Sequence, residues 1–323
     1  MAADTWTHKP FSYMKCRMRF LLTSFFFLST LWASYAFSED TTRIGMNQRV
    51  FATYREEGGW TQLRGAGFFR LAQNILSTNQ FFARDTKVID ITTTSVYISS
   101  IYAEYGLSER FTALAYFPFF MRVVLNEVQF QPSNQRIAGD ALNSVGDMML
   151  GLKYGIVRNR PFVLSASLWL GLPTGNPEGG ETRLLQSGDG ELNQLLKLEA
   201  GYSWSNTPLY ITGGIGLNNR TEDFSDELHL DFEIGYTFLK EQLTGILKLS
   251  SIFSFFNGEA LSAGNGIFAN NTEFVSLGPQ LIYQFSPRWG LDVGAAFAVY
   301  GRNILATPNY SLGLFYKLIP ARK

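Results

Sequence analysis

Charged side chains recur at alternate positions of several apolar segments. In the segment 192–204, LNQLLKLEAGYSW, Lys197 and Glu199 lie on one parity, whereas leucine and aromatic residues occupy the other. Residues of one parity in an extended chain point to the same side, so these charges share a face. In a confined space, charges of both signs can form a polar path for solutes or can neutralise each other as ion pairs. We expect mostly pairing, because an unmatched confined charge is costly.

Ten residues of this parity are the candidates for lining an interior, and their mixed signs argue against a ring selective for one sign of charge. They are Asp147, Lys153, Lys197, Glu199, His229, Asp231, Glu233, Lys248, Asp292 and Lys317. The charge of the whole chain is also balanced, with 27 basic and 27 acidic side chains. Such a balance indicates no nucleic-acid partner.

Beyond the first 36 residues, a single histidine could take part in catalysis or metal binding. His229 is the only histidine there, and the single cysteine, Cys16, lies within those first residues. A hydrolase would need a serine, a histidine and an orienting carboxylate within hydrogen-bond reach. Ser225 and Asp231 are near in sequence, but no nucleophile motif accompanies them, so a solvated histidine is the favoured interpretation. We therefore expect no catalytic residues, no metal site and no cofactor.

An acidic stretch and a glycine-rich stretch offer two other kinds of site. Glu222, Asp223, Asp226 and Glu227 could bind a divalent cation that bridges lipopolysaccharide, although an ordinary solvated loop is the stronger interpretation. The glycine-rich stretch GNPEGGE, residues 175–181, follows an alternating segment and precedes no helix. It is therefore not a phosphate-binding loop.

The elements that carry the charges have the period of a half-buried strand. In LHLDFEIGYTF, residues 228–238, one parity is apolar throughout and the other carries His, Asp, Glu, Gly and Thr. Such segments run for about 10–13 residues, whereas an ordinary strand has about 5–6 and a tilted membrane-crossing strand about 9–11. Beyond residue 36, no window approaches 18 continuous apolar residues, which excludes a helical membrane protein.

Twelve candidate strands follow from this pattern, an even number as expected for a bacterial single-chain barrel. They lie near 63–74, 95–106, 109–122, 146–157, 160–172, 192–204, 207–218, 228–239, 242–254, 272–285, 288–300 and 308–318. Short turns such as GLSER and RNRP alternate with mostly longer polar loops, which places both termini on the periplasmic side.

The predicted fold is all-β: a closed, transmembrane, up-and-down antiparallel β-barrel over residues 59–318. Closure is required because an open sheet edge in lipid would leave backbone groups unpaired. The second and third candidate strands are the least regular, since Ile98, Ile101, Leu114 and Phe120 put apolar groups on both faces.

Aromatic residues cluster on the apolar parity near the short turns and the C-terminal end. This placement predicts a girdle at one membrane interface, because the apolar body of each ring faces lipid and its polar edge reaches water. The girdle candidates are Tyr154, Phe162, Tyr202, Trp204, Tyr236, Phe238, Tyr283, Phe285, Trp289 and Tyr316. Ordinary core aromatics would not gather at one end of every hairpin.

The N-terminal residues have the pattern of an export signal. Lys15, Arg17 and Arg19 precede the apolar run 20–32, and the small residues of ASYA, 33–36, suit a signal peptidase. We expect residues 1–36 to be removed, with 319–323 as a C-terminal tail. Residues 37–58 lack strand alternation, and either remain in the periplasm or fold into the lumen as a plug.

Four runs resemble a known family. YGLSERF (105–111), YFPFF (116–120), VGDMMLGLKY (145–154) and LPTGNPEGG (172–180) are similar to the outer-membrane barrels named for phenol meta-cleavage pathways and described as transporters. Val145 stands where that family frequently has glycine, and the correspondence covers roughly residues 95–180. The resemblance implies an outer-membrane barrel that passes small aromatic or otherwise hydrophobic molecules.

We therefore expect a bacterial outer-membrane channel that passively admits small solutes, in contact with membrane lipids and lipopolysaccharide. Two alternatives remain open at this point. One is an outer-membrane enzyme acting on lipid, and the other is a non-conducting structural or surface-interaction barrel. The residues do not indicate an oligomeric state.

Overall fold

The computed structural model describes residues 58–129, 136–239, 242–261 and 268–320. The predicted export signal and nearly all of the predicted plug segment lie outside these residues. Twelve long strands occur within the described ranges: β1 (Gly67–Phe82), β2 (Val88–Gly106), β3 (Phe111–Leu125), β7 (Met148–Val157), β8 (Phe162–Leu172), β9 (Asn193–Ser203), β10 (Leu209–Asn219), β11 (Glu227–Phe238), β12 (Leu243–Ser254), β13 (Glu273–Gln284), β14 (Trp289–Arg302) and β16 (Pro308–Leu318). Four shorter strands accompany them: β4 (Val128–Gln129), β5 (Arg136–Ile137), β6 (Asp140–Ser144) and β15 (Ile304–Leu305).

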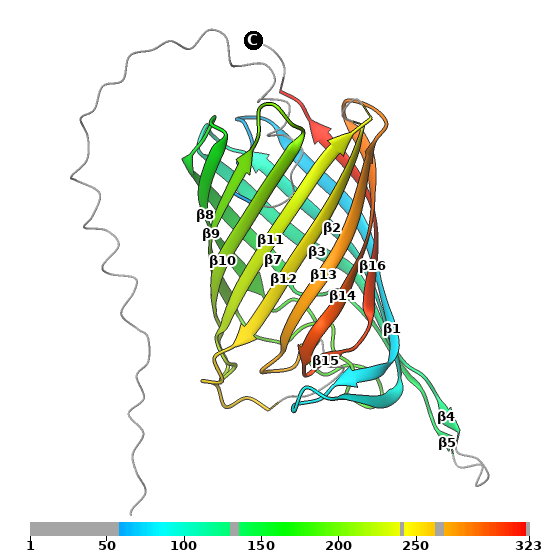
Figure 1. Cartoon of the computed structure of the whole chain (residues 1–323). Helices are drawn as coiled ribbons and strands as arrows, with labels where there is room; N and C mark the ends of the chain where they lie inside the picture. The colour runs from blue at the N-terminus through cyan, green and yellow to red at the C-terminus, as the bar shows by residue number, and fades with distance from the viewer. Residues whose placement is uncertain (1–57, 130–135, 240–241, 262–267, 321–323) are drawn as a thin grey trace, which may run out of the picture. The chain divides into compact units, whose positions relative to one another are not determined.

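The long strands form one antiparallel sheet that closes on itself. Each pairs with its neighbours along the chain, and β1 pairs with both β2 and β16. Phe69, for example, is in register with Ala103 on one side and Tyr316 on the other. The closed barrel is seen from the side in Figure 1. This confirms the predicted fold. Among the described residues, no helix is long and apolar enough to cross a bilayer.

The two ends of the barrel differ. The connections after β2, β7, β9, β11 and β13 are short and lie at the upper end in Figure 1, which we call the short-turn end. The longer connections lie at the opposite end, where β4 and β5 form a small separate hairpin. The outer sections of β1 and β2 are an exception, because only residues 83–87 separate them.

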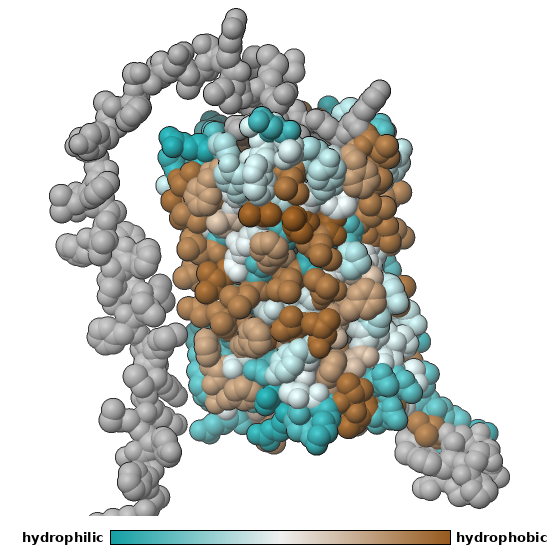
Figure 2. All heavy atoms as spheres, viewed as in Figure 1, coloured by the Kyte–Doolittle hydropathy of each residue, from teal (hydrophilic) through white to brown (hydrophobic). Residues whose placement is uncertain are grey.

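Exposure alternates along the strands as the sequence pattern requires. Leu198 is 46% exposed on the outer face, whereas the next residue, Glu199, is 4% exposed inside the barrel. Figure 2 shows a hydrophobic band across the middle of the visible face, with hydrophilic residues at both ends. A band of this kind matches the hydrocarbon layer of a bilayer flanked by its polar interfaces.

The irregular second and third strands contain a β-bulge. Ser99 is in register with Phe120, but Ile101 is in register with Phe117, so β3 has one extra residue between these pairs. A bulge changes which parity faces inward. Leu114 is therefore buried inside, whereas Phe120 is exposed outside.

Residues 75–94, predicted as a loop between the first two candidate strands, are mostly strand in the structure. β1 continues to Phe82 and β2 begins at Val88, with a tight turn in which Thr86 has a φ of 67°. Leu76 and Ile91 pack against a buried cluster that includes Val96 and Met121. Polar and apolar residues do not alternate regularly in this stretch, so the pattern of period two is weak there although tertiary packing extends the strands.

Candidate functional site: the barrel interior

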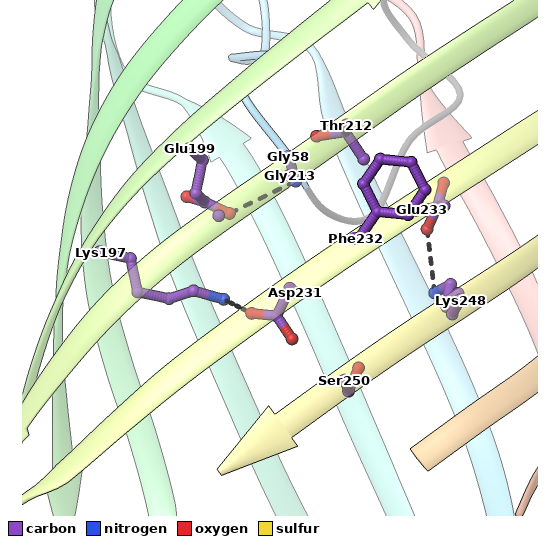
Figure 3. Close-up of a pocket in the computed structure, with 11 residues that line it drawn as sticks. Gly58, Lys197, Glu199, Thr212, Gly213, Asp231, Phe232, Glu233, Lys248 and Ser250 are labelled. Carbon is purple, nitrogen blue, oxygen red and sulfur yellow. Dashed lines mark hydrogen bonds and ion pairs between the residues drawn. The ribbon is translucent and has the colours of Figure 1, made fainter. Parts of the chain in front are cut away.

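Two ion pairs cross the inner wall formed by β9 to β12. The ammonium of Lys197 lies 2.7 Å from the carboxylate of Asp231, and that of Lys248 lies 3.5 Å from Glu233 (Figure 3). Lys197 and Asp231 sit on β9 and β11, so their side chains reach across β10. Gly214 on β10 is in register with Asp231, and its missing side chain leaves room for this contact. These four charged residues, Glu199 and Gly214 line a small cavity.

A third ion pair is buried and also forms hydrogen bonds with the backbone. The Lys153 ammonium is 3.4 Å from Glu199 and donates a hydrogen bond of 2.9 Å to the carbonyl oxygen of Gly58. Glu199 accepts hydrogen bonds from the Gly58 N–H and from the hydroxyl of Ser167. Lys153 and Glu199 are both buried, so the pair is well matched and closely surrounded.

A short stretch that precedes β1 by a few residues lies inside the lumen at the short-turn end. We call residues 58–62 the inner segment. Trp60 packs edge-on against Tyr210, with ring centroids 6.1 Å apart. The N–H of Gln62 donates to the Thr112 hydroxyl at 3.0 Å, and its side-chain amide donates to Glu104 at 2.8 Å. Thus the last residue of the predicted plug segment, Gly58, belongs to a stretch that is held by inward-facing side chains.

The opposite wall combines an ion pair with aromatic rings. Arg70 makes two hydrogen bonds to Asp292, at 2.6 and 2.9 Å, and the Asp292 side chain is fully buried. Lys317 donates to Gln284 at 2.7 Å and lies over the ring of Phe315. Asp292, Lys317 and the three pairs described above account for eight of the ten candidate residues. All eight lie on strands, and the charged group of each has a hydrogen-bond or ion-pair partner.

Inward-facing aromatic residues were not among the sequence candidates. Phe68 stacks on Phe315 with centroids 5.5 Å apart, and Tyr102 lies 6.5 Å from Trp169. These rings belong to the charged parity, which the sequence reasoning treated as polar. Their parity could have identified these inward-facing rings. Trp169, for example, has the same parity as the buried Ser165 and Ser167 of β8.

Histidine, serine and aspartate do not form a catalytic arrangement. The His229 ring is bonded to Glu227 at 3.0 Å, the Ser225 hydroxyl donates to Asn271 at 2.7 Å, and Asp231 pairs with Lys197. Two members of the acidic stretch are engaged by other groups, since Asp226 accepts hydrogen bonds from the amides of Asn219 and Asn257 and Glu227 pairs with Arg220. Arg220 pairs with Asp189, Glu191 and Glu227. Over the part of the chain that the structure describes, no group of three or more metal-binding side chains could hold an ion.

The girdle candidates lie on the outer face near the short-turn end. Several contact one another: Tyr202 with Trp204 and Trp289 with Tyr316, each pair with centroids 4.8 Å apart. Tyr154 packs on Phe111 at 5.0 Å, which adds a residue to the predicted set. Nine of the ten candidates are between 37% and 48% exposed, and Tyr316 is half-buried. Their role at the lipid interface remains a prediction.

Comparison with known proteins identifies the family. A sequence model described as "Putative MetA-pathway of phenol degradation" matches residues 78–313. The chain belongs to this family. The match confirms the resemblance seen in the sequence. No curated protein matches the chain.

Two solved structures are similar to this member of the phenol-degradation family to different degrees. An outer-membrane channel from Pseudomonas putida F1 has a TM-score of 0.54 and 13% identity, covering 80% of this chain and 96% of that one. The translocator domain of the autotransporter NalP from Neisseria meningitidis has a TM-score of 0.47 and 12% identity, covering 83% and 93%. The first likeness shows the fold, that of an outer-membrane β-barrel.

Two of the runs that resemble the phenol-degradation family meet in the structure. Asp147 lies just before β7 and accepts hydrogen bonds from the N–H groups of Gly175 and Asp189, at 2.8 and 2.9 Å. Thr174 donates to the carbonyl of Gly146 at 2.7 Å. We call these contacts the loop clamp, because they fix the ends of loop 173–192 against the start of β7. Unlike the other candidates, Asp147 itself lies outside the strands, where it holds loop backbone.

Burial changes the chemistry of the loop clamp. It raises the pKa of Asp147 to about 6, although the hydrogen bonds from Gly175 and Asp189 favour the charged form, and the nearby Asp189 carboxylate raises it further. Asp147 thus titrates near neutrality, far above an ordinary aspartate at about 3.9.

Proposed function

We propose that this barrel is a channel that passively admits small solutes across the outer membrane. The observation that carries the proposal is the interior of the closed sheet, where a cavity is lined by paired charges of both signs. Family membership supports the same function. Paired charges leave little net field of one sign, so we expect weak charge selectivity.

Solutes with an apolar body and few charges suit this interior best. Tyr102 and Trp169, whose rings lie 6.5 Å apart on the inner face, are partly exposed there, and rings favour flat apolar surfaces. Neighbouring charges are already matched, so they do not demand a charged solute. We therefore propose aromatic and other small hydrophobic compounds as the solute class.

An uptake assay with a blocked lumen tests this proposal. Cells lacking the protein are complemented with the wild type, with Gly214→Phe, or with Ile215→Phe. A Cβ at Gly214 would make ordinary contacts with Glu199 and Leu198, so a side chain is tolerated there, and its ring is expected to enter the space between Lys197 and Asp231 and to narrow the cavity. Ile215 is the next residue on the same strand, is 50% exposed on the outer face and does not line the cavity.

We expect uptake of a panel of aromatic and aliphatic compounds to fall with Gly214→Phe and to stay at the wild-type level with Ile215→Phe. Equal uptake by all three strains and by the deletion strain would contradict a channel function. We also propose that the protein is not an enzyme, since Ser225, His229 and Asp231 engage separate partners. Cleavage of phospholipid or lipopolysaccharide that is abolished by His229→Ala would overturn that part.

A further inference from the structure

Arginine residues gather at the short-turn end of the barrel. The described turns after β2, β7, β9 and β13 carry Arg110, Arg158, Arg160 and Arg288 against one carboxylate, Glu109. Three of the four arginines line a single cleft, together with Ile156, Val157 and Asn159. We call this the rim cleft. Its charge sets it apart from the lumen, where the charges are paired.

Two of the three arginines are held in place by their neighbours. Most of these contacts are with neutral groups, so they do not cancel the positive charge of the cleft. Arg110 donates to the carbonyl oxygen of Gly155 at 3.0 Å, and its guanidinium carbon lies 5.8 Å from the centre of the Tyr154 ring. Arg158 donates to the Thr61 hydroxyl at 3.1 Å and lies 3.6 Å from Glu109. Arg160 is exposed. The cleft thus carries three guanidinium groups, of which, within the described turns, Arg158 alone has a carboxylate at ion-pair distance.

Electrostatics of the cleft itself favour an added anion. Burial lowers the pKa of Arg158, Glu109 counteracts this, and the neighbouring Arg110 lowers it again. An anion placed between the guanidinium groups would relieve their mutual repulsion. Arginine is well suited to phosphate, because its planar group can donate two parallel hydrogen bonds.

The cleft also adjoins the lipid-facing surface. Ile156 forms part of its wall and is exposed on the outer face, and Tyr154 and Phe111 lie beside Arg110 on that face. Aromatic residues of this kind mark the depth of lipid headgroups. Basic pockets at that depth commonly bind anionic lipid headgroups.

We propose that the rim cleft binds the phosphate of an anionic phospholipid in the inner leaflet of the outer membrane. The site rests on the barrel lying in the membrane with its short turns toward the periplasm, and it does not depend on solute passage. Arg110 and Arg160 supply charge at the mouth, Arg158 supplies it at the base, and Ile156 contacts the first acyl carbons.

Native mass spectrometry of the purified full chain in detergent tests the site. Phosphatidylglycerol is titrated against the wild type, Arg110→Gln, Arg160→Gln and the double variant, with phosphatidylcholine as the neutral probe. Each arginine removed is expected to weaken phosphatidylglycerol binding by about five-fold, with the losses multiplying in the double variant. Arg110→Lys should retain part of the affinity, because it keeps the charge but loses the planar donor group.

Arg288→Gln is the matched control, since Arg288 lies in a turn at the same end but outside the cleft. Equal losses from Arg288→Gln would show a general surface charge effect and would overturn the site. So would unchanged binding in the double variant. Displacement of the lipid by inorganic phosphate at the same concentration would show a free-anion site instead.

Heat-dependent electrophoretic mobility checks that each variant is folded. If the double variant does not fold, Arg160→Gln alone decides, because its side chain is exposed and its loss should be tolerated. Solute uptake is expected to remain at the wild-type level in all these variants, so that a failure of the lipid site is distinguishable from a failure of the channel.

Discussion

Trp60 and Tyr210 meet edge-on inside the barrel, with ring centroids 6.1 Å apart and an interplanar angle of 85°. Tyr210 in turn donates its hydroxyl proton to Glu233, the partner of Lys248. Two glycines provide the space, because a Cβ at Gly201 would lie 2.3 Å from the Trp60 ring and one at Gly235 2.1 Å from the Tyr210 ring. The contact therefore joins the inner segment to the charged wall of the lumen.

Trp60→Ala should release the inner segment and raise the conductance of the reconstituted protein. Loss of a buried tryptophan typically costs about 3–5 kcal/mol, which is enough to detach a short stretch of chain. Gly201→Ala should give the same phenotype, because its Cβ would displace the Trp60 ring. Gly245→Ala is the control, since a Cβ there makes only ordinary contacts. Conductance unchanged by both Trp60→Ala and Gly201→Ala would show that the inner segment does not limit the pore.

Asp231→Asn should make the channel prefer anions. The substitution removes the carboxylate that lies 2.7 Å from Lys197 and leaves a net positive charge in the cavity. An interaction of about 1 kcal/mol with a passing ion corresponds to about a five-fold change in the permeability ratio, which is measured as a reversal potential in a salt gradient. The double variant Lys197→Gln with Asp231→Asn should return to the wild-type ratio. A double variant as anion-selective as the single one would refute this reasoning.

Asp292→Asn should destabilise the barrel. Asp292 is the buried partner of Arg70 and also accepts a hydrogen bond from Gln280 at 3.2 Å. Removing one partner of a buried pair typically costs about 3–5 kcal/mol, because the other charge stays buried. Urea unfolding of the protein in lipid vesicles measures the loss. Asp85→Asn serves as a control with no expected change, since its pair with Lys87 lies at the surface.

The stability of the protein should carry a pH dependence that belongs to Asp147. Its pKa is raised to about 6 by burial in the folded chain, so the folded state binds more protons than the unfolded state between about pH 4 and 6. Its stabilising contribution is therefore complete below about pH 4 and lost as the pH rises through about 6. Asp147→Asn should flatten this part of the profile of urea midpoint against pH. A variant with the same slope as the wild type would assign the dependence to other groups.

Regular strands were predictable because a single rule governs them. In β9 and β11, lipid-facing and lumen-facing residues alternate without interruption, and the predicted bounds 192–204 and 228–239 differ from the structure by about a residue. Prediction weakened where that rule is broken. The bulge opposite Ser99 reverses parity in β3, and the polar outer parts of β1 and β2 extend through packing between distant residues.

The interior was only partly predictable, since parity tells which side chains face inward but not how they meet. Lys197 and Asp231 pair across a glycine, a contact that needs the register of three strands. Trp60 reaches Tyr210 from a segment without strand alternation, and nothing local indicates that contact. The loop clamp brings residues 146–147 to 174–175, which requires the fold of the loop between them.

Single-channel recording of the full-length protein in a planar bilayer tests the central claim most directly. The account predicts discrete conductance steps with little preference for anions or cations in the wild type, and larger steps in Trp60→Ala. A bilayer that remains sealed at all voltages with folded wild-type protein and with folded Trp60→Ala would contradict it.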